Sequence, residues 1–262
     1  MSIHALEGRP AVFATGLGRS GTTAMRSALA SHPGIISTSS ENNIVSDLLH
    51  ACDVNATLYS RRVSMQMSEK MYNARFATMI LDLLFPTVQH VDDSIRPLFA
   101  SHLSPSRAER ALQLFPGSRF VCMIREGVAT IESRIAHHTL GKQSFEEHCE
   151  RWASWGVFSE WAAPRHDCLI VRHEQLLEDP VGSIAGVLAF LDLPDHPAPA
   201  EVLTGKRFHP TPDTTRPRWQ TWTEGDRAIF ERICGPAMRS LGYAIPWDRQ
   251  HPPGRQPHHP AA

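Results

Sequence analysis

The chain has 262 residues, of which 42% are hydrophobic, and this is enough to bury the core of one α/β domain. Its 26 basic and 27 acidic residues give a formal net charge of −1, so the composition predicts neither a nucleic-acid partner nor binding to an anionic membrane. Five scattered cysteines, an amino terminus without an apolar leader and the lack of a membrane-length apolar run predict a cytoplasmic protein.

The first predicted element is a buried strand over residues 11–15 that runs into a glycine-rich turn. The turn reads Gly16-Leu17-Gly18-Arg19-Ser20-Gly21, and Thr22 and Thr23 then open an apolar helical pattern. Backbone N–H groups and the positive end of a helix dipole converge at such a turn, and Arg19 adds a fixed charge. The segment therefore predicts a binding site for a phosphate or a sulfate.

This loop differs from the loop of nucleotide triphosphatases, which has the form G-x-x-x-x-G-K-[ST]. The spacing from Gly16 to Gly21 fits that form, but Thr22 occupies the lysine position. No clear acidic strand end supplies a magnesium ligand. We therefore expect the loop to bind phosphate without hydrolysing ATP; the alternative is a glycine turn with no ligand.

The next segments alternate between short strands and helices. We expect strands near residues 35–37 and 88–91, and helices from residue 43, from a Ser68 cap to Phe85, and over 106–114. An irregular stretch over residues 39–66 is expected to line an acceptor pocket.

A second anion site is predicted where the strand over residues 119–124 ends. Arg125 follows this strand at once, and Gly127 starts a helical pattern that runs to Leu140. Open parallel sheets bind ligands at the carboxyl ends of their strands. Ser133 lies about two helical turns further on. For Arg125 taken alone, a surface ion pair is the alternative interpretation.

The remaining third of the chain continues the alternation. A helix over residues 145–162 precedes a strand at Leu169–Arg172, and an irregular segment over 206–222 precedes a last helix. The pattern predicts a P-loop-type α/β fold, with a mostly parallel sheet and helices on both faces. We expect residues 1–247 to form one domain and the Pro- and His-rich residues 248–262 to form a disordered tail.

Taken in this order, the motifs resemble those of the sulfotransferases that use 3′-phosphoadenosine 5′-phosphosulfate (PAPS). The resemblance covers about residues 10–243 and is closest to the protein-tyrosine and related bacterial enzymes, which share the arginine at position 19. It implies that the loop from Arg19 through Ser20, Gly21 and Thr22 to Thr23 holds the 5′-phosphosulfate. It also implies that Arg125 and Ser133 hold the 3′-phosphate and that no metal is needed.

The resemblance implies further site residues. In the tyrosine enzymes an acidic residue shortly after the first helix is the proposed base, and Glu41 falls within one residue of that position. His137 and His138 are rival bases. Arg216 and Arg218 correspond to basic residues that contact the 3′-phosphate in relatives.

Two departures from the family pattern affect these expectations. Relatives carry a lysine before the helix that precedes the second phosphate strand, whereas the matching region here, from His90 through Asp92 to Ser94, has none. Either Arg19 carries that charge alone or another basic residue reaches the site. His173 replaces a tyrosine that packs near the adenine in relatives, so protein tyrosine is not carried over as the substrate.

The leading hypothesis is a PAPS-dependent sulfotransferase in which Arg19 and Glu41 act on a small hydroxylated (or amine) acceptor. The nucleotide would then be the only cofactor. Two alternatives stay open at this point. One is a P-loop kinase-like phosphotransferase, and the other is a catalytically silent nucleotide-binding protein.

Overall fold

The computed structural model describes residues 4–38, 44–62, 68–88, 90–137, 140–205 and 218–248. The chain divides into two compact units. The first comprises Met1–Ile124 and Trp161–Phe208, and the second comprises Arg125–Glu160 and His209–Ala262. All five strands of the described residues belong to the first unit, and the described elements of the second are helical.

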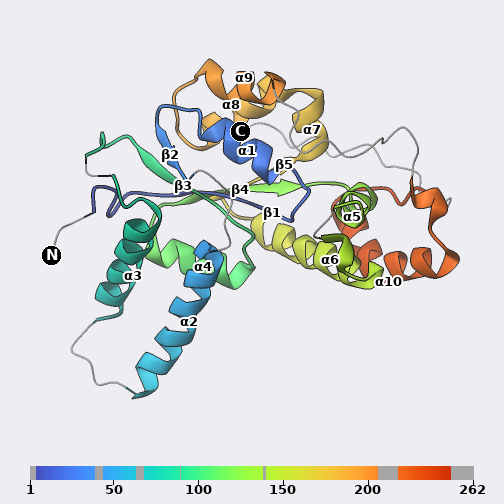
Figure 1. Cartoon of the computed structure of the whole chain (residues 1–262), viewed down its shortest axis with the longest axis horizontal. Coiled ribbons are helices and arrows are strands. Elements are labelled where there is room, and N and C mark those ends of the chain that lie inside the picture. Colours follow the sequence, from blue (N-terminus) through green and yellow to red (C-terminus); the bar gives the residue numbers. More distant parts are fainter. Residues whose placement is uncertain are drawn as a thin grey trace. The chain divides into compact units, whose positions relative to one another are not determined.

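The first unit is built on a parallel sheet (Figure 1). Its strands are β1 (Val12–Gly16), β2 (Ile35–Ser37), β3 (Arg96–Ala100), β4 (Arg119–Ile124) and β5 (Cys168–Arg172). They lie in the order β2-β3-β1-β4-β5, and every adjacent pair is parallel. The carboxyl ends of β1, β3 and β5 therefore share one edge, which confirms the predicted parallel α/β sheet.

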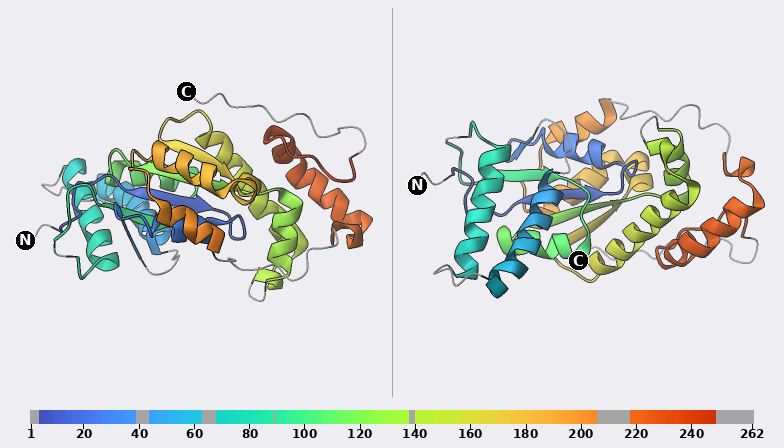
Figure 2. Two further views of the ribbon diagram at one scale, coloured as in Figure 1. Left: turned by 90° about the horizontal axis from the view of Figure 1, so that it is seen from above. Right: turned by 60° about the horizontal axis from the view of Figure 1, so that its bottom comes forward.

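Helices cover both faces of this sheet, as the alternating pattern predicts (Figures 1 and 2). One face carries α1 (Thr22–Leu29), α7 (His173–Glu178), α8 (Pro180–Phe190) and α9 (Pro197–Gly205). The other carries α4 (Pro105–Leu114), on which α2 (Ile44–Arg62) and α3 (Glu69–Leu84) pack. Ser68 caps α3 by accepting a hydrogen bond from the Met71 N–H, as predicted.

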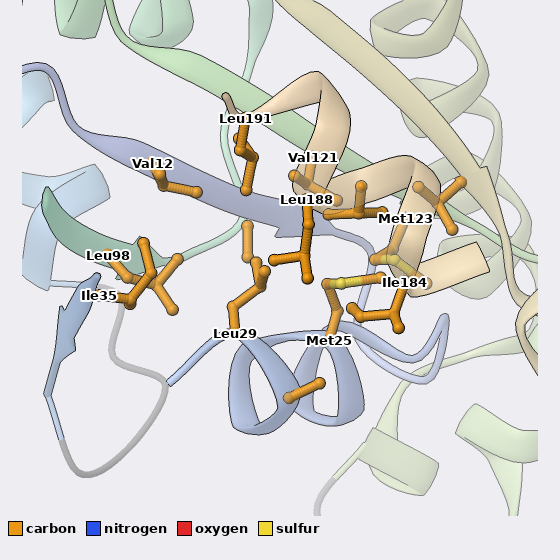
Figure 3. Packing of buried hydrophobic residues seen from close by; sticks show 14 of the residues in the cluster. Val12, Met25, Leu29, Ile35, Leu98, Val121, Met123, Ile184, Leu188 and Leu191 are labelled. Atoms are coloured by element: carbon orange, nitrogen blue, oxygen red, sulfur yellow. The ribbon is translucent and has the colours of Figure 1, made fainter. Parts of the chain in front are cut away.

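The two faces have different cores because successive strand residues point to opposite sides. On the α1 face, aliphatic side chains of the strands meet those of α1 and α8 (Figure 3). On the α4 face, Phe13 lies opposite Phe99 of β3 and Phe120 of β4, with ring centroids 5.2 and 4.9 Å apart. Burial of both faces fixes the register of β1, since a one-residue slip would exchange the two side-chain sets.

The second unit contains α5 (Gly127–Ile135), most of α6 (Phe145–Ala162) and α10 (Glu224–Ser240), with short 3₁₀ turns η1 (Leu140–Lys142) and η2 (Arg218–Thr221). Its largest buried side chains include Trp152, Trp155 and Phe230. The helix expected to reach Leu140 ends at Ile135, and a 3₁₀ turn follows at Leu140.

The strand expected at residues 88–91 is wrong, and the third strand lies at Arg96–Ala100 instead. A turn precedes this strand: the Ser94 N–H donates to the Asp92 carboxylate at 2.8 Å. Proline has no N–H for a sheet ladder and is rare inside central strands. Pro97 nevertheless lies in β3, opposite Ile36 of β2, and this explains why the pattern is hard to recognise from sequence.

Candidate functional site

The predicted anion loop is a tight turn between β1 and α1. The N–H and the hydroxyl of Ser20 both donate to the Leu17 carbonyl, at 3.0 and 2.7 Å. Arg19 and Gly21 adopt left-handed backbone conformations, with φ of 84° and 97°. Because both Ser20 donors are engaged within the turn, Ser20 shapes the loop.

Gly16 and Gly21 are required by this geometry. A Cβ on Gly16 would lie 2.6 Å from the Thr22 hydroxyl oxygen and 2.7 Å from that of Ser20, closer than real Cβ atoms approach. A Cβ on Gly21 would lie 2.8 Å from Cδ2 of His173. Glycine therefore lets the loop fold closely onto its own side chains and onto α7.

The start of helix α1 has backbone N–H groups that no side chain caps. Its N-cap, Gly21, supplies no side-chain cap, and the first turn contains no acidic residue. The first N–H groups of a helix have no partner inside the helix, and the helix dipole places positive charge there. Arg19 is half-buried, and this burial lowers the pKa of its guanidinium. An anion beside the loop would favour the charged form of Arg19.

The structure brings His173 to this loop from a distant part of the sequence. His173 is the first residue of α7, directly after β5, and its ring lies against Gly21. Among the residues predicted from sequence, His173 is therefore placed with the loop. The contact arises because β5 ends at the same edge of the sheet as β1.

The loop after β3 also reaches this edge. The Ser101 N–H donates to the Ala14 carbonyl at 3.2 Å, and the Leu103 N–H donates to the Thr15 hydroxyl at 3.2 Å. Residues 101–104 directly precede α4, which in turn precedes β4. The sequence analysis assigned the position of the relatives' lysine to residues 90–94. This assignment is wrong, because β3 lies between those residues and α4. Neither segment contains a lysine.

The predicted second anion site belongs to the second unit. Arg125 follows the end of β4 and is half-buried, and its carbonyl accepts a hydrogen bond from the Trp152 indole at 3.1 Å. Glu126 caps α5 by accepting from the N–H groups of Val128 and Ala129, at 2.8 and 2.6 Å. Because the Glu126 carboxylate already accepts hydrogen bonds from N–H groups at the start of α5, an anion bound here would be held by side chains instead of by those N–H groups.

Glu132 is a residue of this region that the sequence reasoning missed. It precedes Ser133, whose side chain is buried with 1% exposure. Its carboxylate interacts with the backbone N–H of Arg218 and with the side chain of Trp222, so it joins α5 to η2. Among the described residues its buried Oε1 has no hydrogen-bond partner, and burial raises the pKa of the carboxyl. No local sequence pattern signals this role.

The predicted site residues fall into three groups. The loop residues and His173 belong to the first unit, whereas Arg125, Ser133 and Arg218 belong to the second. His137, which is half-buried, follows α5 in the second unit. Glu41, His138 and Arg216 lie outside the described residues.

The described ranges contain neither a helix that could cross a membrane nor a cluster of metal-ligating side chains. None of the helices in those ranges has the length and apolar character needed to cross a membrane. No group of three or more His, Cys, Asp or Glu side chains in the same ranges is arranged to hold a metal ion.

Comparison with known proteins gives consistent matches. The model of the sulfotransferase family matches residues 10–197. The protein-tyrosine sulfotransferase of Drosophila melanogaster is 26% identical over 197 residues, which are 71% of this chain and 38% of the fly protein. The chain spans about half the length, or less, of the curated relatives it matches.

Solved structures show the same fold. The sulfotransferase domain of the Synechococcus olefin synthase matches with a TM-score of 0.59 and 17% identity, covering 92% of this chain and 97% of that one. A mouse sulfotransferase solved in complex with PAP matches with a TM-score of 0.52 and 14% identity, covering 90% and 88% of the two chains.

Proposed function

The chain belongs to the sulfotransferase family, and we propose that it moves the sulfuryl group of PAPS to a hydroxyl or amine of a small-molecule acceptor. The observation that carries this proposal is the loop from Gly16 to Thr23, a tight turn that opens an uncapped helix. The mouse enzyme that shares the fold was solved with PAP, the product of the donor.

The loop fits a phosphate group. The absence of side chains at Gly16 and Gly21 lets the backbone fold closely, and the start of α1 offers N–H groups that no side chain caps. The half-buried guanidinium of Arg19 adds positive charge. Arg19, Thr22 and Thr23 would therefore hold the 5′-phosphosulfate.

The same residues would assist the reaction. PAPS, when bound, supplies a sulfuryl group on a phosphate leaving group, which gains negative charge during transfer. Preorganised donors facing such charge typically contribute about 3–4 kcal/mol each in the transition state. The N–H groups of the α1 start and the Arg19 guanidinium are suited to this role.

A base is needed to take the acceptor proton, and we assign Glu41 to it, with His137 and His138 as rivals. A carboxylate that follows a short strand and a polar run is suited to a site position. The assignment rests on the sequence resemblance.

We assign recognition of the 3′-phosphate to Arg125 and Ser133, with support from Arg216 and Arg218. Glu126 caps the start of α5, so the helix itself does not offer its N–H groups there. Selectivity for the 3′-phosphate would then depend on side chains, above all on Arg125, whose guanidinium can bind a phosphate with two hydrogen bonds.

Calorimetric titration tests this proposal. Wild type, Arg125→Ala and the exposed control Arg151→Ala are titrated with 3′-phosphoadenosine 5′-phosphate (PAP), ADP and AMP. We expect wild type and the control to prefer PAP strongly, and Arg125→Ala to lose about tenfold to a hundredfold of that preference. Equal or absent binding of all three nucleotides to wild type would refute the sulfotransferase assignment.

The acceptor class and the cellular location are also proposals. His173, at the position of the relatives' tyrosine, supports an acceptor other than protein tyrosine. The five cysteines all lie in described ranges and are free thiols, which supports a reducing, cytoplasmic location. The acceptor class is tested with a panel of phenols, amines and sugars, assayed with PAPS for sulfated products. The cellular location is tested by cell fractionation.

A further inference from the structure

The half-buried carboxylate of Glu132 is not explained by the stability of the second unit. Its Oε1 is buried and has no hydrogen-bond partner among the described residues. A buried acceptor without a partner lowers the free energy of unfolding, and so does a buried charge. A neutral side chain at this position of α5 would avoid both costs. Local rules of stability are broken mainly at functional sites, so Glu132 calls for a functional explanation.

Glu132 contacts the segment that carries a predicted phosphate ligand. Its carboxylate interacts with the backbone N–H and the positive charge of Arg218, the first residue of η2, and with the side chain of Trp222. The only polar group of a tryptophan side chain is the indole N–H, which is a donor. Two donors of one short segment therefore meet a single carboxylate of α5.

Aromatic packing anchors the other end of this segment. The Trp222 ring lies against Phe145 at the start of α6 and against Phe230 of α10, with ring centroids 4.7 and 5.5 Å apart. Phe230 is fully buried, so Trp222 is fixed to the core of the second unit. The segment is thus held by ring packing at Trp222, and Glu132 holds it at Arg218.

This arrangement places Arg218 with the other residues assigned to the 3′-phosphate. Ser133, which is 1% exposed, is the next residue after Glu132 on α5, and Arg125 lies two residues before the start of that helix. A long arginine side chain loses conformational entropy when it binds a phosphate. Fixing the residue before the ligand arrives reduces that cost and strengthens binding.

We propose that Glu132 is a positioning residue for recognition of the 3′-phosphate, which it serves by holding Arg218 beside Ser133. The proposal rests on the proposed function. Glu132 itself does not contact the phosphate, because both groups are anionic, and it acts through Arg218 instead. Charge alone gives the opposite expectation: removing a carboxylate near an anion site should strengthen anion binding. The direction of the effect therefore separates the two explanations.

The test compares PAP with AMP, which differ only in the 3′-phosphate. Both are titrated calorimetrically into wild type, Glu132→Ala, Glu132→Gln, Arg218→Ala and the double variant Glu132→Ala/Arg218→Ala. Glu150→Ala is the matched control, because Glu150 is an exposed glutamate of α6 in the same unit. Thermal unfolding of each variant checks that it is folded. If Glu132→Ala fails to fold, Glu132→Met replaces it, since methionine keeps the side-chain length but is only a weak acceptor.

We expect Glu132→Ala to bind PAP about tenfold more weakly than wild type does and to bind AMP equally well. Glu132→Gln keeps an acceptor oxygen and should stay within about threefold of wild type for PAP. Glu150→Ala should match wild type. In the Arg218→Ala background, Glu132→Ala should weaken PAP binding by less than about twofold more, because the residue it positions is already gone.

Three results would overturn the role of Glu132. Glu132→Ala might bind PAP as tightly as wild type or more tightly, it might lose affinity for PAP and AMP to the same extent, or its effect might multiply with that of Arg218→Ala. Failure of the proposed function looks different, since wild type would then bind PAP no more tightly than AMP. That result would overturn the sulfotransferase assignment together with the role of Glu132.

Discussion

Replacing Gly21 by alanine should damage the anion loop in two separable ways. Gly21 has φ of 97°, and an L side chain in the left-handed region costs about 1–2 kcal/mol. The added Cβ would lie 2.8 Å from Cδ2 of His173, and overpacking of this kind costs about 1–3 kcal/mol. Together the two effects should lower the free energy of unfolding by about 3 kcal/mol, or the Tm by roughly 6–12 °C.

The assay is thermal and urea unfolding of Gly21→Ala, His173→Ala and the double variant. Removing the His173 ring should remove the steric part, so Gly21→Ala should cost about 1–2 kcal/mol less in the His173→Ala background. Gly186→Ala is the control, since a Cβ there would meet nothing within 4 Å, and alanine in a helix is neutral or stabilising. An equal cost in both backgrounds would refute the contact with His173. A cost under about 0.5 kcal/mol in both would refute the whole account of the loop.

Two further predictions concern charge. Burial raises the pKa of the Glu132 carboxyl, so its contribution to stability is lost as pH rises from the ordinary value of 4.5 through the higher folded value. Glu132→Gln should therefore raise Tm at pH 7–8 but not near pH 4, whereas the exposed control Glu150→Gln should change it at neither pH; thermal unfolding in the two buffers checks this. Arg19→Ala and Glu41→Ala should keep the wild-type far-UV circular dichroism spectrum and lose sulfated product by at least about a hundredfold. Near-normal turnover of Glu41→Ala would transfer the role of base to a histidine.

The sequence was most informative where structure depends on neighbouring residues. The Ser68 cap of α3 involves Met71, three positions away, and helix α6 follows its apolar pattern from Phe145 to Ala162 as predicted. The anion loop belongs to the same class, since its glycines, its turn and the start of α1 lie within eight residues of one another. Such features can be recognised because propensity, capping and turn geometry act locally.

The sequence was least informative where a role depends on partners from elsewhere in the chain. Strand β3 was not recognised because Pro97 interrupts the strand pattern, and with β3 the position of the segment at Ser101 beside the end of β1 was missed. Glu132 gave no signal, since its partners lie more than 80 residues later. Glu126 lies two residues after the end of β4, and only the structure shows that it caps its own helix.

The sequence by itself therefore predicted a parallel α/β sheet and a glycine-rich turn of the sulfotransferase kind between β1 and α1, because short-range patterns specify both. The tertiary structure decided which side chains surround that loop. The ring of His173 and the segment at Ser101 reach it because β5 and β3 end at the same edge of the sheet as β1. Strand order and register arise from packing between distant segments, and no local pattern encodes them.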